Sequence, residues 1–268
     1  MIPAPSGATR LYVIVGDPIA QVRSPAGVSA EFAARGHDGI LVPVQVATAD
    51  LPEFLPVASR LKNLDGIVVT IPHKFACYQA CASATERAHF LRTVNLMRRC
   101  ADGSWHGDMV DGLGFLGAAR AKGIDPRGMR ALLVGAGGAG SAIALALVET
   151  GVRELAVHDS EAERRDALIG RLNGLGKAPV RAGSIDPTGF DFVANATPAG
   201  MTEGDPLPVD VTRLAPSAYC GCVITKPEIS PFIAEARKLG CVTATGTDMY
   251  QQHQSIMVDF LLGTDGGR

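Results

Sequence analysis

The stretch that decides the fold reads Arg130-Ala-Leu-Leu-Val-Gly135-Ala-Gly137-Gly138-Ala-Gly140-Ser141 and continues into the apolar segment 142–149. Its glycines follow the pattern G-x-G-x-x-G, directly after a strand-like apolar run and before a helix-like run. In such a unit Gly135 permits a tight turn, Gly137 lets the backbone approach a pyrophosphate, and Gly140 lets helix and strand pack closely. The amino end of the helix offers N–H groups to phosphates. We therefore predict a Rossmann unit whose loop residues Gly135, Gly137, Gly138, Ala139 and Gly140 bind a dinucleotide.

The next predicted strand supports this interpretation, because Glu154–Asp159 ends in an acid about 20 residues beyond the loop, where a ribose-binding carboxylate belongs. A carboxylate at Asp159 accepts hydrogen bonds from ribose hydroxyls and repels a 2′-phosphate, so NAD is favoured over NADP as the cofactor. We expect Arg164 and Arg165, one turn into the following helix, to face solvent. The alternative is a tight turn that binds nothing, with Asp159 a solvated strand end.

Composition limits the classes of partner. The 268 residues contain 25 Lys and Arg against 27 Asp and Glu, and 47% of the residues are hydrophobic. This near-balance of charge gives no electrostatic reason to expect nucleic acid or an anionic membrane, so a small molecule is the default partner. The start of the chain lacks the pattern of a signal peptide, and the uncharged stretch Ala131–Val148 is interrupted by glycines. We therefore expect a cytoplasmic protein, with monomer and homodimer both left open.

The six cysteines show no metal-binding spacing, since no C-x-x-C pair occurs and no histidine cluster completes a zinc site. We predict that they are reduced and mostly buried, and that the protein holds no metal. They are Cys77, Cys81, Cys100, Cys220, Cys222 and Cys241.

Alternating strand and helix signals run along the whole chain and predict an α/β protein with largely parallel sheets. The expected strands are 11–16, 40–44, 65–71, 93–98, 130–134, 154–159, 190–195 and 218–224. The expected helices include 25–36, 50–61, 73–91, 112–122 and 248–262. Ser24 and Asp50 stand where each could cap a helix. We predict a substrate-binding and catalytic domain over residues 1–112, to which the C-terminal helix 247–268 returns, and a dinucleotide-binding domain over 113–246.

An ordered set of motifs resembles the shikimate dehydrogenase family almost from end to end. Gly16-Asp-Pro18-Ile-Ala-Gln-Val-Arg-Ser24-Pro25 is similar to the family's G-x-P-I-x-H-S-x-S-P, and Val69-Thr70-Ile-Pro72-His-Lys74 to its V-T-x-P-x-K. The later matches are Val94-Asn95 to V-N, Gly107-Asp-Met-Val-Asp111-Gly112 to G-x-N-T-D-G, and Asn195-Ala-Thr197-Pro-Ala-Gly200-Met201 to N-x-T-x-x-G-M. The order of the set makes it more specific than any one motif.

The resemblance implies that Lys74 and Asp111 form the catalytic pair. Oxidation of a secondary alcohol needs a base for the hydroxyl proton while the hydride leaves for the nicotinamide. The helix dipole disfavours a cation in the first turn of a helix, where we expect Lys74, and an acid such as Asp111 would pair with the ammonium and orient it. Taken alone, Lys74 could be a solvated helix residue and Asp111 a helix cap. The order of the two motifs in the chain favours catalytic roles for both residues.

The resemblance also assigns binding roles. It implies that Ser24, Thr70 and Asn95 contact the substrate carboxylate and hydroxyls, although Ser24 could equally be only a helix cap. Asn195 and Thr197 are expected at the end of a Rossmann strand on the nicotinamide side. Met201 could line the cofactor or belong to the core.

Several positions depart from the family pattern and alter the expected substrate contacts. Val22 replaces the first serine of S-x-S-P, Val68 replaces an asparagine, and Met109-Val110 replace N-T. Thr225 stands where the family commonly has tyrosine, and His253 where it has glutamine. His253 could supply a replacement hydrogen bond to the substrate, or it could be bonded only within the helix packing.

The sequence therefore predicts an NAD(P)-dependent alcohol dehydrogenase similar to shikimate dehydrogenase. The reaction implied is reversible hydride transfer between 3-dehydroshikimate and shikimate, as in shikimate metabolism and aromatic amino acid biosynthesis. The cofactor is NAD, favoured by Asp159, or NADP. Because three or four lost hydrogen bonds would each cost about 1–3 kcal/mol, a related substrate such as quinate or an amino analogue is the alternative. A non-catalytic protein that senses dinucleotides is the second alternative.

Overall fold

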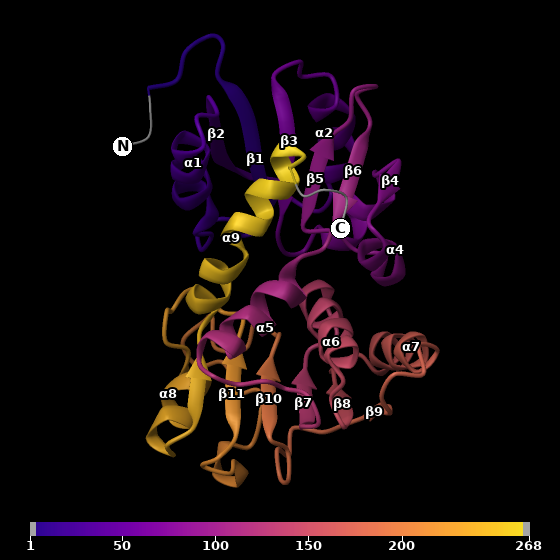
Figure 1. Ribbon diagram of the computed structural model, residues 1–268, viewed down its shortest axis with the longest axis vertical. Coiled ribbons are helices and arrows are strands. Elements are labelled where there is room, and N and C mark those ends of the chain that lie inside the picture. The colour runs from indigo at the N-terminus through magenta and orange to yellow at the C-terminus, as the bar shows by residue number, and fades with distance from the viewer. Residues whose placement is uncertain (1–3, 265–268) are drawn as a thin grey trace. The chain divides into compact units, whose positions relative to one another are not determined.

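The computed structural model describes residues 4–264, and these form two compact units. The first unit comprises residues up to Val110 and from Gln254 onward, and the second comprises Asp111–His253. Residues 1–3 and 265–268, which the sequence analysis assigned to the substrate domain, lie outside the described residues. Both units contain sheets and helices (Figure 1), so the fold is α/β as predicted.

The first unit is built on a six-stranded mixed sheet, sheet A, with the order β2-β1-β3-β5-β6-β4. Strands β1, β2 and β3 run parallel, whereas β5 is antiparallel to both β3 and β6. The strands are β1 (Arg10–Gly16), β2 (Gly39–Gln45), β3 (Leu64–Val69), β4 (Ser83–Ala84), β5 (Leu96–Arg99) and β6 (Trp105–Asp108). The helices are α1 (Ser24–Ala34), α2 (Leu51–Ala58), α3 (Lys74–Gln79) and α4 (Glu86–Leu91).

The prediction of one continuous helix over 73–91 is wrong, because the helix is interrupted. The chain forms α3, then the short strand β4, then α4. Strand β4 pairs with β6, a strand that the sequence analysis missed. The break in the helix is stabilised by Thr85, whose hydroxyl accepts a hydrogen bond from the amide of Ala88 and so caps α4.

The core of the first unit joins the sheet to the C-terminal helix. Helix α9 (Gly246–Leu262) starts in the second unit, and its residues from Gln254 onward belong to the first. One cluster of buried side chains includes Tyr12, Phe32, Val68, Leu96, Val110 and Phe260. The only tryptophan of the sequence, Trp105, is also buried here; its indole N–H donates to Ser59 Oγ at 2.8 Å, and the guanidinium of Arg99 lies over its ring.

The second unit has a parallel six-stranded sheet, sheet B, with the order β12-β11-β10-β7-β8-β9. Its strands are β7 (Arg130–Val134), β8 (Glu154–His158), β9 (Val180–Ala182), β10 (Phe192–Asn195), β11 (Tyr219–Cys222) and β12 (Val242–Ala244). Its helices are α5 (Asp111–Ala121), α6 (Gly138–Thr150), α7 (Ala162–Asn173) and α8 (Pro231–Lys238), with a short 3-10 helix η1 (Val211–Arg213). Helices α5 and α6 pack side by side (Figure 1).

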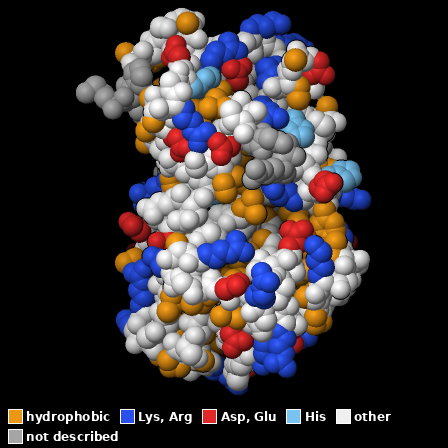
Figure 2. Space-filling model, in the orientation of Figure 1, with side chains coloured by type: hydrophobic (Ala, Val, Ile, Leu, Met, Phe, Trp, Pro, Cys, Tyr) orange, Lys and Arg blue, Asp and Glu red, His pale blue; other side chains and the backbone are white. Residues whose placement is uncertain are grey.

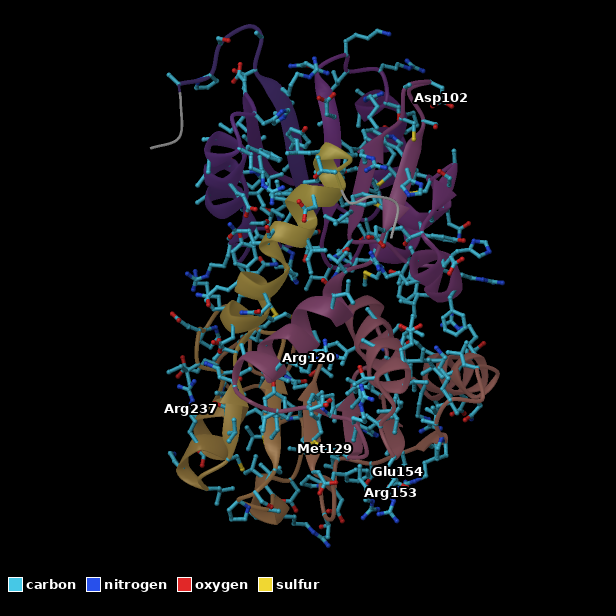
Figure 3. The ribbon with its side chains drawn as sticks, in the orientation of Figure 1. Asp102, Arg120, Met129, Arg153, Glu154 and Arg237 are labelled. Atoms are coloured by element: carbon cyan, nitrogen blue, oxygen red, sulfur yellow. The ribbon has the colours of Figure 1, made fainter. Side chains whose placement is uncertain are left out.

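The chain order explains where ligands can bind on sheet B. In an open parallel sheet the loops that follow the strands gather at one edge, and the crevice forms where the strand order reverses. Strand β7 lies between β10 and β8, so the order reverses beside the loop after β7. Glu154, labelled in Figure 3, marks the opposite edge, where it pairs with Arg130 at the start of β7. The Gly-rich loop thus follows β7 at the reversal point.

All six cysteines are free, and four of them are buried, as predicted. Within residues 4–264 no helix combines the length and apolar character needed to cross a bilayer. On the face seen in Figure 2, acidic and basic side chains are interspersed.

Candidate functional site

The Gly-rich loop after β7 has the backbone that its sequence requires. Gly135 has a φ of 103°, in the region that favours glycine, and a Cβ on it would lie 2.8 Å from the carbonyl carbon of Ala196. A Cβ on Gly140 would lie 1.9 Å from the carbonyl oxygen of Gly135, so this helix residue must also be glycine. Both glycines therefore serve close packing of the loop, the helix and the neighbouring strand end.

Gly137 differs from these two glycines, because a Cβ added there would meet nothing within 4 Å. Gly137 is the N-cap of α6, and the helix begins at Gly138. Open space at the positive end of a helix is what a phosphate group needs in order to approach the backbone N–H groups. The loop thus fits a pyrophosphate at Gly137, Gly138, Ala139 and Gly140, whose roles as cofactor ligands remain predictions.

Asp159 follows β8 and is tied to the Gly-rich loop. Its carboxylate accepts hydrogen bonds from the amide of Ala136 at 2.6 Å, from the amide of Glu161 at 2.8 Å and from the guanidinium of Arg164 at 2.7 Å. Burial alone would raise the pKa of Asp159, but these three donors bring it below its ordinary value. Asp159 is therefore a carboxylate at neutral pH and helps to fix the loop.

Arg164 is partly exposed, in line with the expectation, but its guanidinium also pairs with Asp159 and with Glu161. Arg165 pairs instead with its neighbour Asp166, which is largely exposed. A carboxylate that could hold ribose hydroxyls and a cation that could hold a phosphate therefore lie in direct contact. Sequence spacing could not reveal this pairing, because it depends on the rotamer of Arg164.

Asn195 and Thr197 shape the loop after β10. The side-chain oxygen of Asn195 accepts hydrogen bonds from the amide and hydroxyl of Thr197, and its amide nitrogen donates to the carbonyl of Ala199 and to Cys222 Sγ. Met201 is partly buried and packs against the core of this unit. The side chain of Asn195 thus holds the loop after β10 in shape through contacts within the protein.

In the first unit, residues implied to bind substrate meet at the carboxyl edge of sheet A. Thr70 and Lys74 follow β3, and Asn95 precedes the antiparallel strand β5, so all three lie at one edge. The amide of Val69 donates to the carbonyl of Asn95, and the amide of Val94 donates to that of Lys74. The far end of the sheet is marked by Asp102 in the β5–β6 turn (Figure 3).

Lys74 is the first residue of α3 and is only 9% exposed. Cys77, one turn further along the same helix, is fully buried, and burial raises the pKa of its thiol to about 12. Cys77 is therefore a neutral thiol at physiological pH, which excludes it as a nucleophile. Lys74 is the charged side chain of α3.

Asn95 is held by main-chain contacts that lead towards Asp111. Its amide donates to the carbonyl of Asp108, and its side-chain oxygen accepts from the amide of Val110. Asp111, the next residue, begins α5 and is 5% exposed. Lys74 and Asp111 fall in different units, and their catalytic roles remain predictions.

Ser24 does not cap α1, contrary to one of the two expectations for it. It is the first residue of the helix, Arg23 occupies the cap, and no side-chain hydrogen bond caps the helix. Asp50 likewise makes no capping bond to α2. Ser24 is buried, and its hydroxyl has no partner within the described chain. A buried hydroxyl left in this state costs stability, which is consistent with a role in binding a ligand.

Three valines that depart from the family pattern lie in or against an apolar core, and His253 packs against a helix. Val68 and Val110 lie within the apolar core of the first unit, and Val22 packs against that core. His253 is buried in the second unit, where its ring lies against Gly114 of α5 and contacts Tyr250. The valines thus replace polar side chains by groups that cannot hydrogen-bond, whereas His253 sits in helix packing.

One carboxylate near this edge was missed by the sequence analysis. Asp108 is almost fully buried and accepts hydrogen bonds from Arg87, from the hydroxyl of Thr85 and from the amide of Met109. The ion pair between Arg87 and Asp108 fixes the end of β6, after which the chain continues through Val110 to Asp111. Across residues 4–264, no group of three or more His, Cys, Asp or Glu side chains could hold a metal ion.

Comparison with known proteins identifies the family to which the chain is similar. Residues 14–97 match the family described as the shikimate dehydrogenase substrate binding domain. The chain is 34% identical to a shikimate dehydrogenase (NADP(+)) of Rubrobacter xylanophilus, over 91% of this chain and 88% of that protein. It is 33% identical to the enzyme of the same name from Rhodospirillum rubrum, again over 91% and 88%.

Solved structures with a similar fold include proteins named for other substrates. A quinate dehydrogenase from Corynebacterium glutamicum, in complex with NAD, has a TM-score of 0.82 at 28% identity, covering 95% of this chain and 94% of that one. A 5-ketofructose reductase of Gluconobacter sp. strain CHM43 has a TM-score of 0.81 at 27% identity, covering 95% and 93%.

Proposed function

This chain belongs to the shikimate dehydrogenase family, and we propose that it is an enzyme that transfers a hydride reversibly between a nicotinamide dinucleotide and a secondary alcohol or ketone. The relationship extends over 91% of the chain at 34% identity. The observation that carries the proposal is the placement of Lys74, buried at the start of α3 on the same edge of sheet A as Thr70 and Asn95. The oxidoreductase class follows from the family, and the roles of individual residues are our proposal.

Lys74 and Asp111 are proposed as the catalytic pair. A bound nicotinamide dinucleotide supplies the redox chemistry. Lys74 takes up the hydroxyl proton when the alcohol is oxidised and returns it when the ketone is reduced, which lowers the barrier to hydride transfer. Asp111 stabilises the ammonium form and orients it. The low exposure of both side chains supports these roles, because charges act more strongly where water is excluded.

Ser24, Thr70 and Asn95 are proposed to bind the substrate. The orphaned hydroxyl of Ser24 supports this role, since a ligand oxygen would give it the partner that the protein does not. His253 is a weaker candidate for the same role, because its ring is packed against Gly114.

The cofactor is NAD or NADP, and we propose that both are accepted. The relatives named above are NADP(+) enzymes, whereas the quinate dehydrogenase structure contains NAD. Asp159 favours NAD by accepting from ribose hydroxyls, and Arg164 beside it offers a cation to a 2′-phosphate. The carboxylate remains charged at neutral pH and repels that phosphate, so we propose NAD as the preferred form.

Shikimate is the first substrate that the family suggests, and the three valines support a second candidate. Val22, Val68 and Val110 stand where the family pattern has polar side chains, and all three pack on or in the apolar core. These valines offer no hydrogen bonds and so change the set of contacts that a substrate can make, and a related compound such as quinate, an amino analogue or an uncharged hydroxyketone is therefore the alternative. We propose further that the enzyme acts in the cytoplasm on free small molecules, as a monomer or homodimer.

The test is the initial rate of NAD and NADP reduction with shikimate, quinate and an aminoshikimate, and of NADH and NADPH oxidation with 3-dehydroshikimate and 5-ketofructose. We expect turnover with at least one of these compounds. Tight dinucleotide binding without turnover on any compound would contradict the enzymatic proposal and favour a dinucleotide sensor.

A further inference from the structure

The residue directly before Lys74 is a buried histidine whose side chain makes one defined hydrogen bond. His73 is 1% exposed, and its Nε2 lies 2.7 Å from the carbonyl oxygen of Val46. A carbonyl oxygen can only accept, so Nε2 carries the proton and donates it. The other ring nitrogen, Nδ1, is buried and has no partner among residues 4–264. The hydrogen bond therefore fixes which edge of the ring faces Val46.

This hydrogen bond connects two strand ends that are not neighbours. Val46 follows β2 and His73 follows β3, while β1 lies between those two strands. The imidazole therefore reaches across the end of β1. Two backbone hydrogen bonds join the segment 70–73 to β1 and the residue after it. Thr70 N donates to Val15 O and Asp17 N donates to Ile71 O, both at 2.9 Å. The side chain of His73 extends this attachment to β2.

A glycine at the end of β1 makes room for the crossing. A Cβ on Gly16 would lie 2.3 Å from Thr70 Cγ2 and 2.9 Å from the carbonyl oxygen of Ile71. Any larger residue would push the segment away from β1, because the second of these contacts is with backbone. The bare backbone of Gly16 thus lets the segment lie close enough for His73 to reach Val46.

The backbone of Lys74 is also held by a hydrogen bond of its own. Its carbonyl oxygen accepts a hydrogen bond from the amide of Val94, at 3.1 Å. The start of α3 is therefore fixed between Val46 and Val94. Since His73 and Lys74 are consecutive, the orientation of the His73 peptide sets the direction in which the Lys74 side chain leaves the helix.

We propose that His73 is a positioning residue for Lys74 and acts through its Nε2–H bond to the carbonyl of Val46. The proposal rests on the proposed function, in which Lys74 transfers the proton. His73 is buried and bonded to the protein, so it acts on the reaction only through the placement of Lys74. A catalytic group displaced by about 1 Å can lose on the order of 100-fold in rate.

A matched pair of variants tests the bond. The side-chain nitrogen of glutamine can take the place of Nε2 and reach Val46, whereas asparagine carries the same amide on a shorter arm. We expect His73→Gln to keep kcat within about threefold of the wild type, and His73→Asn to lower it by roughly 10-fold to 100-fold. The dissociation constant of the dinucleotide should be unchanged in both, because the Gly-rich loop lies in the other unit. Equal kcat values for the two variants would overturn the proposal.

A second measurement does not depend on turnover. Each variant, including His73→Leu, is treated with an amine-reactive reagent across a pH series, and the labelling of Lys74 is compared with that of exposed Lys62 by peptide mass spectrometry. We expect the Lys74:Lys62 ratio to change in the Asn and Leu variants and to stay near the wild-type value in the Gln variant. An unchanged ratio in all three would overturn the positioning role. If the wild type fails to turn over any substrate while the ratio changes as expected, the proposed function fails and the positioning of Lys74 stands.

Discussion

The guanidinium of Arg164 donates to the carboxylate of Asp159 across 2.7 Å, so the acid that follows β8 and a cation of α7 form one ion pair. The same carboxylate binds the amide of Ala136 in the Gly-rich loop. A change at either side chain will therefore alter both the electrostatics and the shape of the place where we propose that the adenosine ribose binds.

Cofactor choice is the first prediction from this pair. Asp159→Ser removes the charge that repels a 2′-phosphate while it leaves Arg164 in place, and we expect the ratio of kcat/KM for NADP over NAD to rise by about tenfold. Arg164→Ala should lower the same ratio. The control is Arg165→Ala, which removes a nearby cation that pairs with Asp166 instead. An unchanged cofactor ratio in both test variants would remove Asp159 and Arg164 from cofactor selection.

Two glycines of the Gly-rich loop should respond differently to the same substitution. Gly140→Ala places a Cβ 1.9 Å from a backbone oxygen, so we expect a loss of stability of roughly 2–4 kcal/mol. Gly137→Ala meets no atom within 4 Å, and the protein should stay within about 1 kcal/mol of the wild type. Its dinucleotide affinity should nevertheless fall by at least about tenfold, because the methyl group would occupy phosphate space. Urea unfolding and NADPH titration separate the two effects, and wild-type affinity in Gly137→Ala would contradict the proposed phosphate site.

Lys74→Ala should abolish turnover by removing the proposed proton acceptor, with a loss in kcat of at least about 100-fold. Dinucleotide binding, followed by fluorescence titration, should remain. Lys62→Ala removes an exposed lysine from the same unit and serves as the matched control. If the Lys74→Ala enzyme turned over at the wild-type rate, Lys74 would have no part in the mechanism.

The ion pair between half-buried Arg87 and buried Asp108 should matter far more than a surface pair. Arg87→Leu removes the cation and leaves the Asp108 carboxylate with the hydroxyl of Thr85 and the amide of Met109 as donors, so it should cost about 3 kcal/mol of unfolding free energy. The comparison is Lys177→Ala, whose partner Glu149 is 3.9 Å away and half exposed; this change should cost less than about 0.5 kcal/mol. Similar values for both variants in urea unfolding would show that Asp108 is hydrated in solution.

Asp248 supplies a pH-dependent contribution to stability. Partial burial alone would raise its pKa, but hydrogen bonds from Thr245 and the ion pair with Lys122 hold the pKa below its ordinary value. A depressed folded-state pKa means that the stabilisation is present above the unfolded-state pKa and is lost as the pH falls through the folded-state pKa. Asp248→Asn should therefore lose about 1 kcal/mol at neutral pH and much less at an acidic pH below the folded-state pKa. Unfolding free energies measured at both pH values check this, and a constant difference would contradict it.

The longer parallel strands of both units could be predicted from the sequence, because runs such as 130–134 and 11–16 are apolar on both faces and bounded by turns. The short strands β6, β9 and β12 could not, since each contains polar side chains and is held mainly by its neighbours. The interruption after α3 has the same origin: strand β4 forms because β6 is there to pair with it.

The proposed site residues could be identified from the sequence because they belong to short motifs. Their contacts were not, as two examples show. Arg164 turns back to Asp159, and His73 reaches Val46 across a strand that is distant in sequence. Both contacts depend on side-chain direction, which spacing along the chain does not encode.

The burial of Trp105 gives the protein a built-in optical probe. Because this indole is the only one in the sequence and lies in the first unit, tryptophan emission reports on the unfolding of sheet A alone. Loss of NADPH affinity would report on the Gly-rich loop of the second unit. A denaturant titration followed by both signals in one cuvette would therefore reveal whether the two units melt together or in sequence.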